Sequence, residues 1–511
     1  MLTDRSAGSR TIGLRWIRSS ASCGADDEHA SVRQGAAMTD IEFLLGRTQR
    51  HAAEFLNGLD RRPVRPSATL EELRHRLGAP LEERGMDAAQ VIDELVLATS
   101  GGHLGSASGR SFAWVMGGVL PSALAADWLV STWDNNAALY VSAPAAAVAE
   151  EVAGKWVKDI LGLPSQASFA FTTGCQMAHA TCLAAARHAL LSERGWNVEQ
   201  DGLFGAPRIR VLANENRHAS LTRALRFLGF GSNCVEALAT DADARLETAT
   251  LVEAIQRQPA APTILVLNAA DLNVGAFDPF GELISCAKAS GAWVHVDAAF
   301  GLWARASTRR RSLAEGIEAA DSWATDAHKW LNTPQDIGIA IVAHPEAHKA
   351  AMDISAAYLS PDGRVRDPLD WTPEWSRRAR GFPVYAALRE LGREGTGHLI
   401  DRCCEHADRL VRGLGALPGV EVIAYPTLNQ GLVRFPDHRL GASDADHDAW
   451  TDRMIEAINR EGTAFFSGTT WQRRRAMRIS VVNWRTSNED VERTLRAVAA
   501  VLQDQRQGPG R

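Results

Sequence analysis

The chain has 511 residues, of which 45% are hydrophobic and 23% charged, values that are ordinary for a protein with packed cores. Its formal net charge of -6 gives no reason to expect nucleic acid or an anionic membrane surface as a partner. No apolar run could span a bilayer, and the cysteines lack CxxC spacing, so we expect a cytoplasmic protein of two or three subdomains with free thiols.

The pattern of residues divides the chain into four parts. Residues 1–37 are rich in Arg, Ser, Gly and Ala without apolar periodicity, and we expect them to be disordered or to precede the true start. Residues 38–110 carry helical patterns such as TLEELRHRL and DAAQVIDELVLA. We expect a large domain over 111–385, followed by a small C-terminal domain over 386–505, in which helices cover antiparallel strands.

A candidate phosphate site follows a short β-rich piece that ends at Gly174. Good helix formers begin near Gln176, and the glycine allows a tight turn between the two elements. The start of a helix offers free backbone N–H groups and the positive end of its dipole to an anion. The signal is weak by itself, because many turns look alike. We interpret His179, on the same helix, as structural.

The most informative stretch runs from Trp293 to Trp330. A short apolar run, Trp293 to Val296, delivers Asp297 at its carboxyl end, where ligands of open α/β sheets bind. The segment DSWATDAHKWLN then delivers His328 and Lys329. An enzyme of pyridoxal phosphate (PLP) needs this combination, because a lysine holds the cofactor as a Schiff base and a carboxylate keeps the pyridine nitrogen protonated.

The motifs HVDAAFG and DAHKWL resemble the group II PLP-dependent decarboxylases, the family of aromatic-L-amino-acid decarboxylase, from about residue 63 to 501. The resemblance implies an α/β architecture of PLP fold type I, similar to aspartate aminotransferase. A large, mostly parallel seven-stranded sheet is then joined by a small C-terminal α+β domain. It also implies a homodimeric carboxy-lyase, with its active site at the subunit interface, that uses PLP and no metal to decarboxylate an L-amino acid, an aromatic one among the candidates.

The resemblance also assigns roles to residues around the cofactor. Lys329 would carry PLP, Asp297 would pair with its pyridine nitrogen, and His218 would stack on the ring with the small Ala299 on the opposite face. The remaining implied cofactor contacts are Gly174, Cys175 and Gln176 at the phosphate, together with Asp271, Asp326 and His328.

The substrate side is less specific. Phe112 and Trp114 match one wall of the family's substrate pocket, although the chain lacks the usual His-Pro there, and both could equally be core residues. Arg485 is a candidate for substrate contact. Tyr358 would return a proton to the substrate carbon after CO2 leaves. Two alternatives remain open: another PLP enzyme, such as an aldehyde synthase, aminotransferase or aldolase, and a non-catalytic PLP-binding protein.

Overall fold

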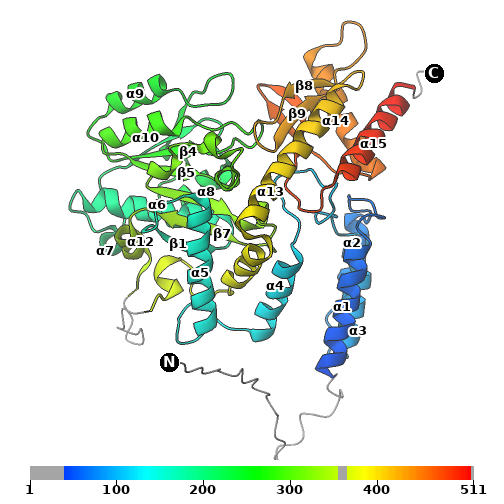
Figure 1. Cartoon of the computed structure of the whole chain (residues 1–511), viewed down its shortest axis with the longest axis horizontal. Helices are drawn as coiled ribbons and strands as arrows, with labels where there is room; N and C mark the ends of the chain where they lie inside the picture. Colours follow the sequence, from blue (N-terminus) through cyan, green and yellow to red (C-terminus); the bar gives the residue numbers. More distant parts are fainter. Residues whose placement is uncertain (1–39, 355–364, 508–511) are drawn as a thin grey trace, which may run out of the picture.

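Three helices at the start of the chain stand apart from the rest of the molecule (Figure 1). The computed structural model describes residues 40–354 and 365–507, so the expectation for 1–37 lies outside the described residues. The helices are α1 (Ile41–Asn57), α2 (Leu70–Leu77) and α3 (Ala88–Ala98). A capping box between Thr69 and Glu72 fixes the start of α2. The predicted helices of this segment are therefore present, while its status as a separate unit stays a prediction.

The large domain is built on a seven-stranded sheet with the order β1-β7-β6-β5-β4-β2-β3. Strand β7 is antiparallel to β1 and β6, and the remaining pairs are parallel. This confirms the predicted mostly parallel sheet. The strands are β1 (Ser168–Thr172), β2 (Arg210–Asn214), β3 (Val235–Leu238), β4 (Thr263–Asn268), β5 (Trp293–Asp297), β6 (Ser322–Asp326) and β7 (Gly338–Val342).

Helices cover both faces of this sheet, which is why most of its strands are buried throughout. Alternate residues face opposite layers: in β4, Ile264 packs on one layer and Leu265 on the other. One layer contains α6 (Cys175–Ser192), α8 (Ala219–Phe227) and α12 (Pro345–Met352). The other contains α5 (Pro144–Leu161), α9 (Thr248–Arg257), α10 (Phe280–Ala289) and part of α13 (Gly381–Gly415).

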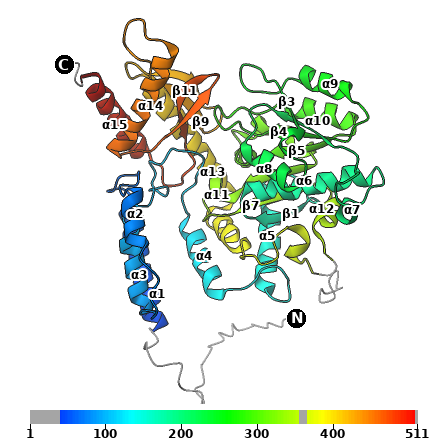
Figure 2. The ribbon, with the colours of Figure 1, turned by 180° about the vertical axis from the view of Figure 1, so that it is seen from behind.

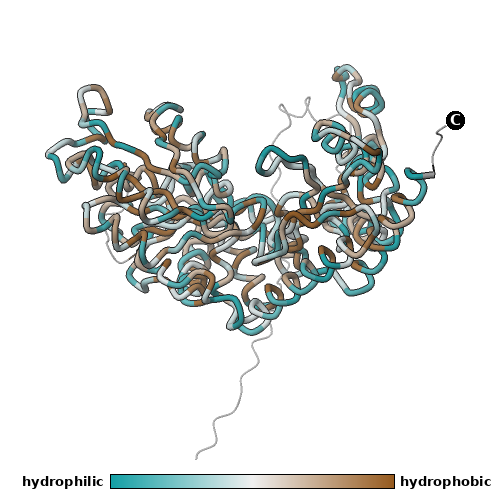
Figure 3. The backbone as a smooth tube through the Cα atoms, turned by 90° about the horizontal axis from the view of Figure 1, so that it is seen from above, coloured by the Kyte–Doolittle hydropathy of each residue, from teal (hydrophilic) through white to brown (hydrophobic). Residues whose placement is uncertain are grey.

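The small domain has a four-stranded antiparallel sheet with the order β10-β11-β9-β8. Its strands are β8 (Glu421–Ala424), β9 (Gln430–Arg434), β10 (Ser467–Trp471) and β11 (Arg474–Ser480), and its helices are α14 (Asp444–Glu461) and α15 (Asn488–Gln507). Figure 2 shows this domain beside the large one, and in Figure 3 hydrophobic segments cross the interior of both lobes. The predicted α+β architecture is confirmed.

Two features join the domains. Helix α13 runs from one to the other with a break at Gly392, so the boundary that we expected near residue 385 falls inside this helix. The buried amide of Asn332 forms the second link: its Nδ2 donates to the carbonyl of Val482, and its Oδ1 accepts from the N–H groups of Gly118 and Trp484. Among the described residues, no helix is long and apolar enough to cross a membrane.

Candidate active site

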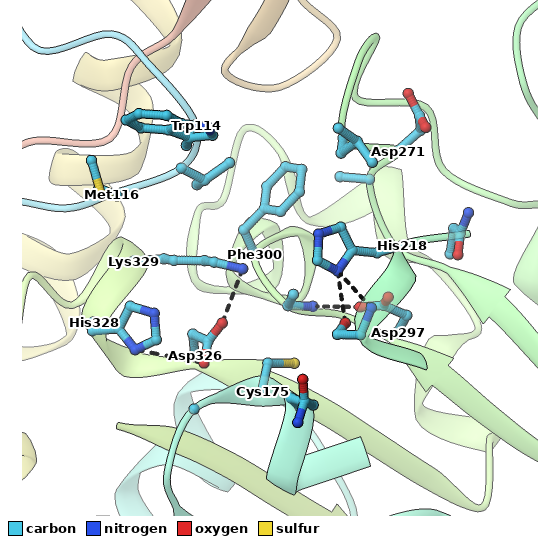
Figure 4. A pocket seen from close by; sticks show the side chains of 18 of the residues that line it. Trp114, Met116, Cys175, His218, Asp271, Asp297, Phe300, Asp326, His328 and Lys329 are labelled. Atoms are coloured by element: carbon cyan, nitrogen blue, oxygen red, sulfur yellow. Dashed lines mark hydrogen bonds and ion pairs between the residues drawn. The ribbon is translucent and has the colours of Figure 1, made fainter. Parts of the chain in front are cut away.

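A cavity of about 440 Å³ lies at the carboxyl edge of the parallel strands (Figure 4). Strands β4, β5 and β6 end at this edge, because parallel strands in register present the same end to one side of the sheet. Most of the residues that we predicted from the sequence line this one cavity: Trp114, Gly174, Cys175, Gln176, His218, Asp271, Asp297, Ala299, Asp326, His328 and Lys329.

Lys329 lies in α11 (Ala327–Trp330), the short helix that directly follows β6. Its ammonium Nζ is 2.9 Å from Oδ2 of Asp326, the last residue of the strand, as Figure 4 shows. Burial alone would lower the pKa of Lys329, but the surrounding groups, with Asp326 the foremost and Asp297 among the others, together raise that pKa above its ordinary value. His328 Nδ1 is 3.6 Å from the other oxygen of Asp326, which has no hydrogen-bond partner among the described residues.

Asp297 ends β5 and is only 8% exposed. Its Oδ1 accepts a hydrogen bond from the backbone N–H of Ala299 and lies 3.5 Å from Nε2 of His179. Burial alone would raise the pKa of Asp297, yet His179, with His218 and Lys329, holds that pKa well below its usual range. The cavity therefore has a permanent negative charge at its base.

His218 caps the start of α8 and faces the cavity near Phe300 (Figure 4). Its Nδ1 accepts from the backbone N–H of Ser220 and lies 2.7 Å from the hydroxyl of the same residue. Burial lowers the pKa of His218, an effect that the charge of Asp297 opposes. A neutral imidazole with its proton on Nε2 is the form that these contacts favour.

The turn before α6 has the geometry of an anion cradle. Gly174 has a φ of +76° and occupies the N-cap position, so no side chain covers the first N–H groups of this 18-residue helix. Gly338 of β7 lies directly against it, since a Cβ added at Gly338 would be 2.2 Å from the carbonyl carbon of Gly174. The two glycines therefore let the cradle close against the sheet next to His328.

These donors fit PLP. The cradle supplies N–H groups for a phosphate, Lys329 an amine for the aldehyde, Asp297 a buried carboxylate for the pyridine nitrogen, and His218 an imidazole for a ring face. Cys175, His179 and Asp297 also place one donor atom each within 4.8 Å of one another. The sequence predicts no metal here, and this stays a prediction.

Asp271 and Arg478 add two buried charges to the cavity wall. Oδ1 of Asp271 accepts from the backbone N–H groups of Asn273 and Val274, so it caps the turn, while its Oδ2 has no partner among the described residues. Arg478 Nη1 donates to the carbonyl of Leu272. Burial lowers the pKa of Arg478, and Asp271 opposes this effect.

The structure places three other predicted residues elsewhere. Phe112 is fully buried and stacks on Phe466, because the backbone around it forms hydrogen bonds with the small domain. It is therefore a core residue and does not line the cavity. Arg485 lies over the ring of Trp484 and lines a separate surface hollow. Tyr358 lies outside the described residues.

Sequence reasoning missed Arg478, although it lies in the same segment as Arg485. It also missed the contact of His179 with Asp297. A signal was present for Arg478: successive side chains of a strand point to opposite faces, so a residue near the end of β11 can face the large domain. The apolar wall residues Val115, Met116, Leu272 and Phe300 were not singled out either.

Comparison with known proteins agrees with this geometry. The chain is 24% identical to an aromatic-L-amino-acid decarboxylase of Bacillus atrophaeus, over 88% of this chain and 93% of that protein. It is 26% identical to an L-2,4-diaminobutyrate decarboxylase of Rhizobium meliloti (strain 1021), over 94% of each. The crystal structure of Oryza sativa TDC with PLP and tryptamine superposes with a TM-score of 0.85 at 23% identity, covering 92% of this chain and 99% of that one.

Residues 75–436, which contain the cradle, Asp297 and Lys329, match the pyridoxal-dependent decarboxylase conserved domain. The match covers well over half of the chain, and the cavity supplies each donor that the cofactor requires. The chain therefore belongs to the pyridoxal-dependent decarboxylase family.

Proposed function

We propose that this protein is a homodimeric, cytoplasmic decarboxylase of an L-amino acid with a large apolar or aromatic side chain. One observation carries the proposal: Lys329, Asp297 and His218 converge on a single cavity that ends in an anion cradle. Six cysteines in the described ranges are free thiols, which supports a reducing compartment.

Bound PLP would supply an electron-withdrawing ring that accepts the electron pair of the bond to the departing carboxylate. The residues of the chain would do the rest. Lys329 provides the amine that holds the cofactor, and Asp326 orients that amine 2.9 Å away. Asp297 would hold the ring nitrogen and favour its protonated form, because a neighbouring anion stabilises the charged form of its partner. His218 would cover one face of the ring.

The wall above Lys329 favours an apolar substrate side chain. Trp114, Met116 and Phe300 are labelled there in Figure 4, and Val115 and Leu272 also line the cavity. The ring of Phe300 is centred 5.9 Å from Nζ of Lys329. Such a wall offers water few hydrogen-bond partners, and a water-poor site favours loss of a charged carboxylate as neutral CO2.

The sequence suggested that Arg485 contacts the substrate. We assign that contact to Arg478, with the carboxylate of the substrate as its partner. It is the one guanidinium that lines the cavity in the described part of the chain. If Arg478 held the substrate carboxylate too firmly, the carboxylate would resist leaving as CO2. The ion pair between the two groups must therefore be of moderate strength. Two features moderate it: Nη1 of Arg478 already donates to the carbonyl of Leu272, and the charge of Asp271 is nearby.

Tyr358 would deliver the proton that replaces CO2 on the substrate carbon, a role that rests on the resemblance alone.

The main alternative, an aldehyde synthase, would release an aldehyde and ammonia in place of an amine. The second alternative, a PLP-binding protein without catalysis, conflicts with the substrate-sized cavity next to Lys329.

We propose a second copy of this chain as the partner that covers the N-terminal helices. Large apolar side chains on α1 and α3 are exposed, among them Phe43 at 53% and Leu95 at 51%. Helix α4 (Pro121–Trp133) also exposes Trp128, Leu129 and Trp133. Exposed apolar surface on this scale marks an interaction site. In a symmetric dimer, the N-terminal helices of both copies would be covered.

The first test of the function is CO2 release from a panel of L-amino acids. We expect release with an aromatic or large apolar substrate, formation of the matching amine, and loss of both in Lys329→Ala, which removes the amine that holds PLP. An aldehyde product would favour the synthase. No turnover of any amino acid by protein with PLP bound through Lys329 would contradict the proposal.

The effect of Asp326 can be tested through pH. Only a neutral amine can capture the PLP aldehyde, and Asp326 raises the pKa of Lys329, so capture by cofactor-free protein should accelerate as pH rises. In Asp326→Asn the pKa of Lys329 falls, and the rate profile, followed by visible absorbance, should shift to lower pH. Asp370→Asn, which removes a carboxylate paired with Lys349 away from the cavity, should leave the profile in place.

Replacement of Arg478 tests the substrate contact. In Arg478→Met the charge is lost while an unbranched apolar stem is kept, so KM should rise by about tenfold or more, as expected for one charged hydrogen bond. The value of kcat should fall less. Arg485→Met serves as the control and should leave KM unchanged, whereas equal effects of the two substitutions would remove the assignment.

The dimer can be tested by light scattering on the purified protein. The native chain should have twice its monomer mass of 55.3 kDa. The double variant Phe43→Glu and Leu95→Glu puts charges on the exposed apolar faces and should shift the mass towards that of one chain. Leu440→Glu, at a fully exposed position of the small domain, should remain dimeric. A monomeric native protein would rule the proposal out.

A further inference from the structure

His179 lies directly behind Asp297, on the side of the carboxylate that faces α6. It is fully buried, and its Nε2 is 3.5 Å from Oδ1 of Asp297 and 3.6 Å from the sulfur of Cys175. Burial raises the pKa of Cys175 well above its ordinary value, so this neighbour remains a neutral thiol. The strongest electrostatic partner of Nε2 is therefore the carboxylate.

The other nitrogen of His179 begins a chain of buried contacts. Its Nδ1 is 2.8 Å from Nε2 of His295, whose Nδ1 is 2.9 Å from the hydroxyl of Ser322. The indole Nε1 of Trp293 donates to the same hydroxyl at 3.0 Å. We call Trp293, Ser322, His295 and His179 the histidine relay. Burial lowers the pKa of His295 to about 3, so this member is neutral.

The sequence explains how the relay assembles. Side chains alternate along a strand, so Trp293, His295 and Asp297 all point to the face of β5 that α6 covers. Ser322 comes from the neighbouring strand β6, whose pairing places it opposite His295. The relay therefore depends on the register of two central strands and on one helix.

The direction of the protons follows from the far end of the relay. An indole N–H can only donate, so the hydroxyl of Ser322 accepts from Trp293. Its own hydrogen then has one remaining partner among the described contacts, Nδ1 of His295. That nitrogen must be unprotonated, so the proton of neutral His295 is on Nε2 and is donated to Nδ1 of His179. The proton of His179 is thereby placed on Nε2, facing Asp297.

The opposite direction fits less well. A hydrogen bond with the backbone of Ser322 opposes the fall in the pKa of His295 and favours a proton on the ring nitrogen that faces Ser322. If His295 donated from that nitrogen, however, the buried hydroxyl hydrogen of Ser322 would have no acceptor among the described contacts, which costs free energy. Nε2 of neutral His179 would then turn a lone pair towards the negative oxygen of Asp297. A cationic His179 would restore the contact with Asp297 but would leave the Ser322 hydrogen unpaired.

We propose that the histidine relay makes His179 a fixed, neutral hydrogen-bond donor to Asp297, and thereby a positioning residue for the cofactor. The donor holds the carboxylate in one orientation and favours its ionised form. Its purpose rests on the proposed function, because the ion that Asp297 must hold is the protonated ring nitrogen of PLP. The direction of its protons does not depend on that function.

The relay itself can be tested without cofactor or substrate. In cofactor-free protein labelled with 15N-histidine, NMR should show both His179 and His295 as neutral rings with the proton on Nε2, assigned by the signals lost in His179→Gln and His295→Gln. In Ser322→Ala the hydroxyl donor is gone, so Nδ1 of His295 loses its hydrogen bond and the 15N signal of that nitrogen should shift. A doubly protonated His179, or an Nδ1 proton in the native protein, would overturn the proposal.

The role of His179 as a positioning residue can be tested by measuring the affinity of the protein for PLP. His179→Leu removes the donor, and it should weaken PLP binding by at least about tenfold, the effect of one charged hydrogen bond. Affinity for the carbon analogue of PLP, in which a C–H group replaces the ring nitrogen, should change little. His179→Gln, whose amide can still donate to Asp297, should recover part of the PLP affinity. Equal losses for both ligands would indicate a purely structural role and contradict the proposal.

The two sets of results separate the inference from the proposed function. Protons placed as expected, with a selective loss of PLP affinity, support the relay even if no amino acid is decarboxylated. Decarboxylation by the native protein, with His179 found cationic, would keep the function and reject the relay.

Discussion

A carboxylate that must stay ionised out of water is the constraint around which this protein is arranged. Asp297 is almost fully buried at the end of a central strand, where burial favours the neutral acid. The charge persists because polar groups surround it: the imidazole of His179, the backbone N–H of Ala299 and the nearby ammonium of Lys329. A hydrophobic layer on each face of the sheet holds those groups in place.

The second buried carboxylate, Asp326, performs a different task on the next strand. It holds Lys329 rather than a ring nitrogen, and its remaining oxygen lies near His328. Asp297 lies opposite Ala324 in the pairing of the two strands, so Asp326 stands two residues further along β6, and each acid has a different partner. Under the proposed function, the same edge of the sheet would supply both the group that anchors the cofactor and the group that keeps its ring electron-poor.

Much of this could be predicted from the sequence, because strand ends and short motifs are local signals. Asp297 ends the apolar run of β5, and Lys329 lies in the specific motif DAHKWL. Residues whose placement depends on tertiary packing were harder. Phe112 and Trp114 are two positions apart, yet the first is in the core and the second lines the cavity, where its backbone has a φ of +55°. Arg478 and Arg485 could not be separated without the orientation of β11 relative to the large domain.

The link made by Asn332 has a consequence for how this protein can change over evolution. The cavity has one wall from the large domain, with Lys329, and another from the small domain, with Arg478. A single side-chain amide, three residues after Lys329, bonds to the backbone on both sides. Substrate preference therefore depends partly on the position of the small domain relative to the large domain. Substitutions that shift the small domain by a fraction of an ångström can retune the pocket while every residue lining it is unchanged.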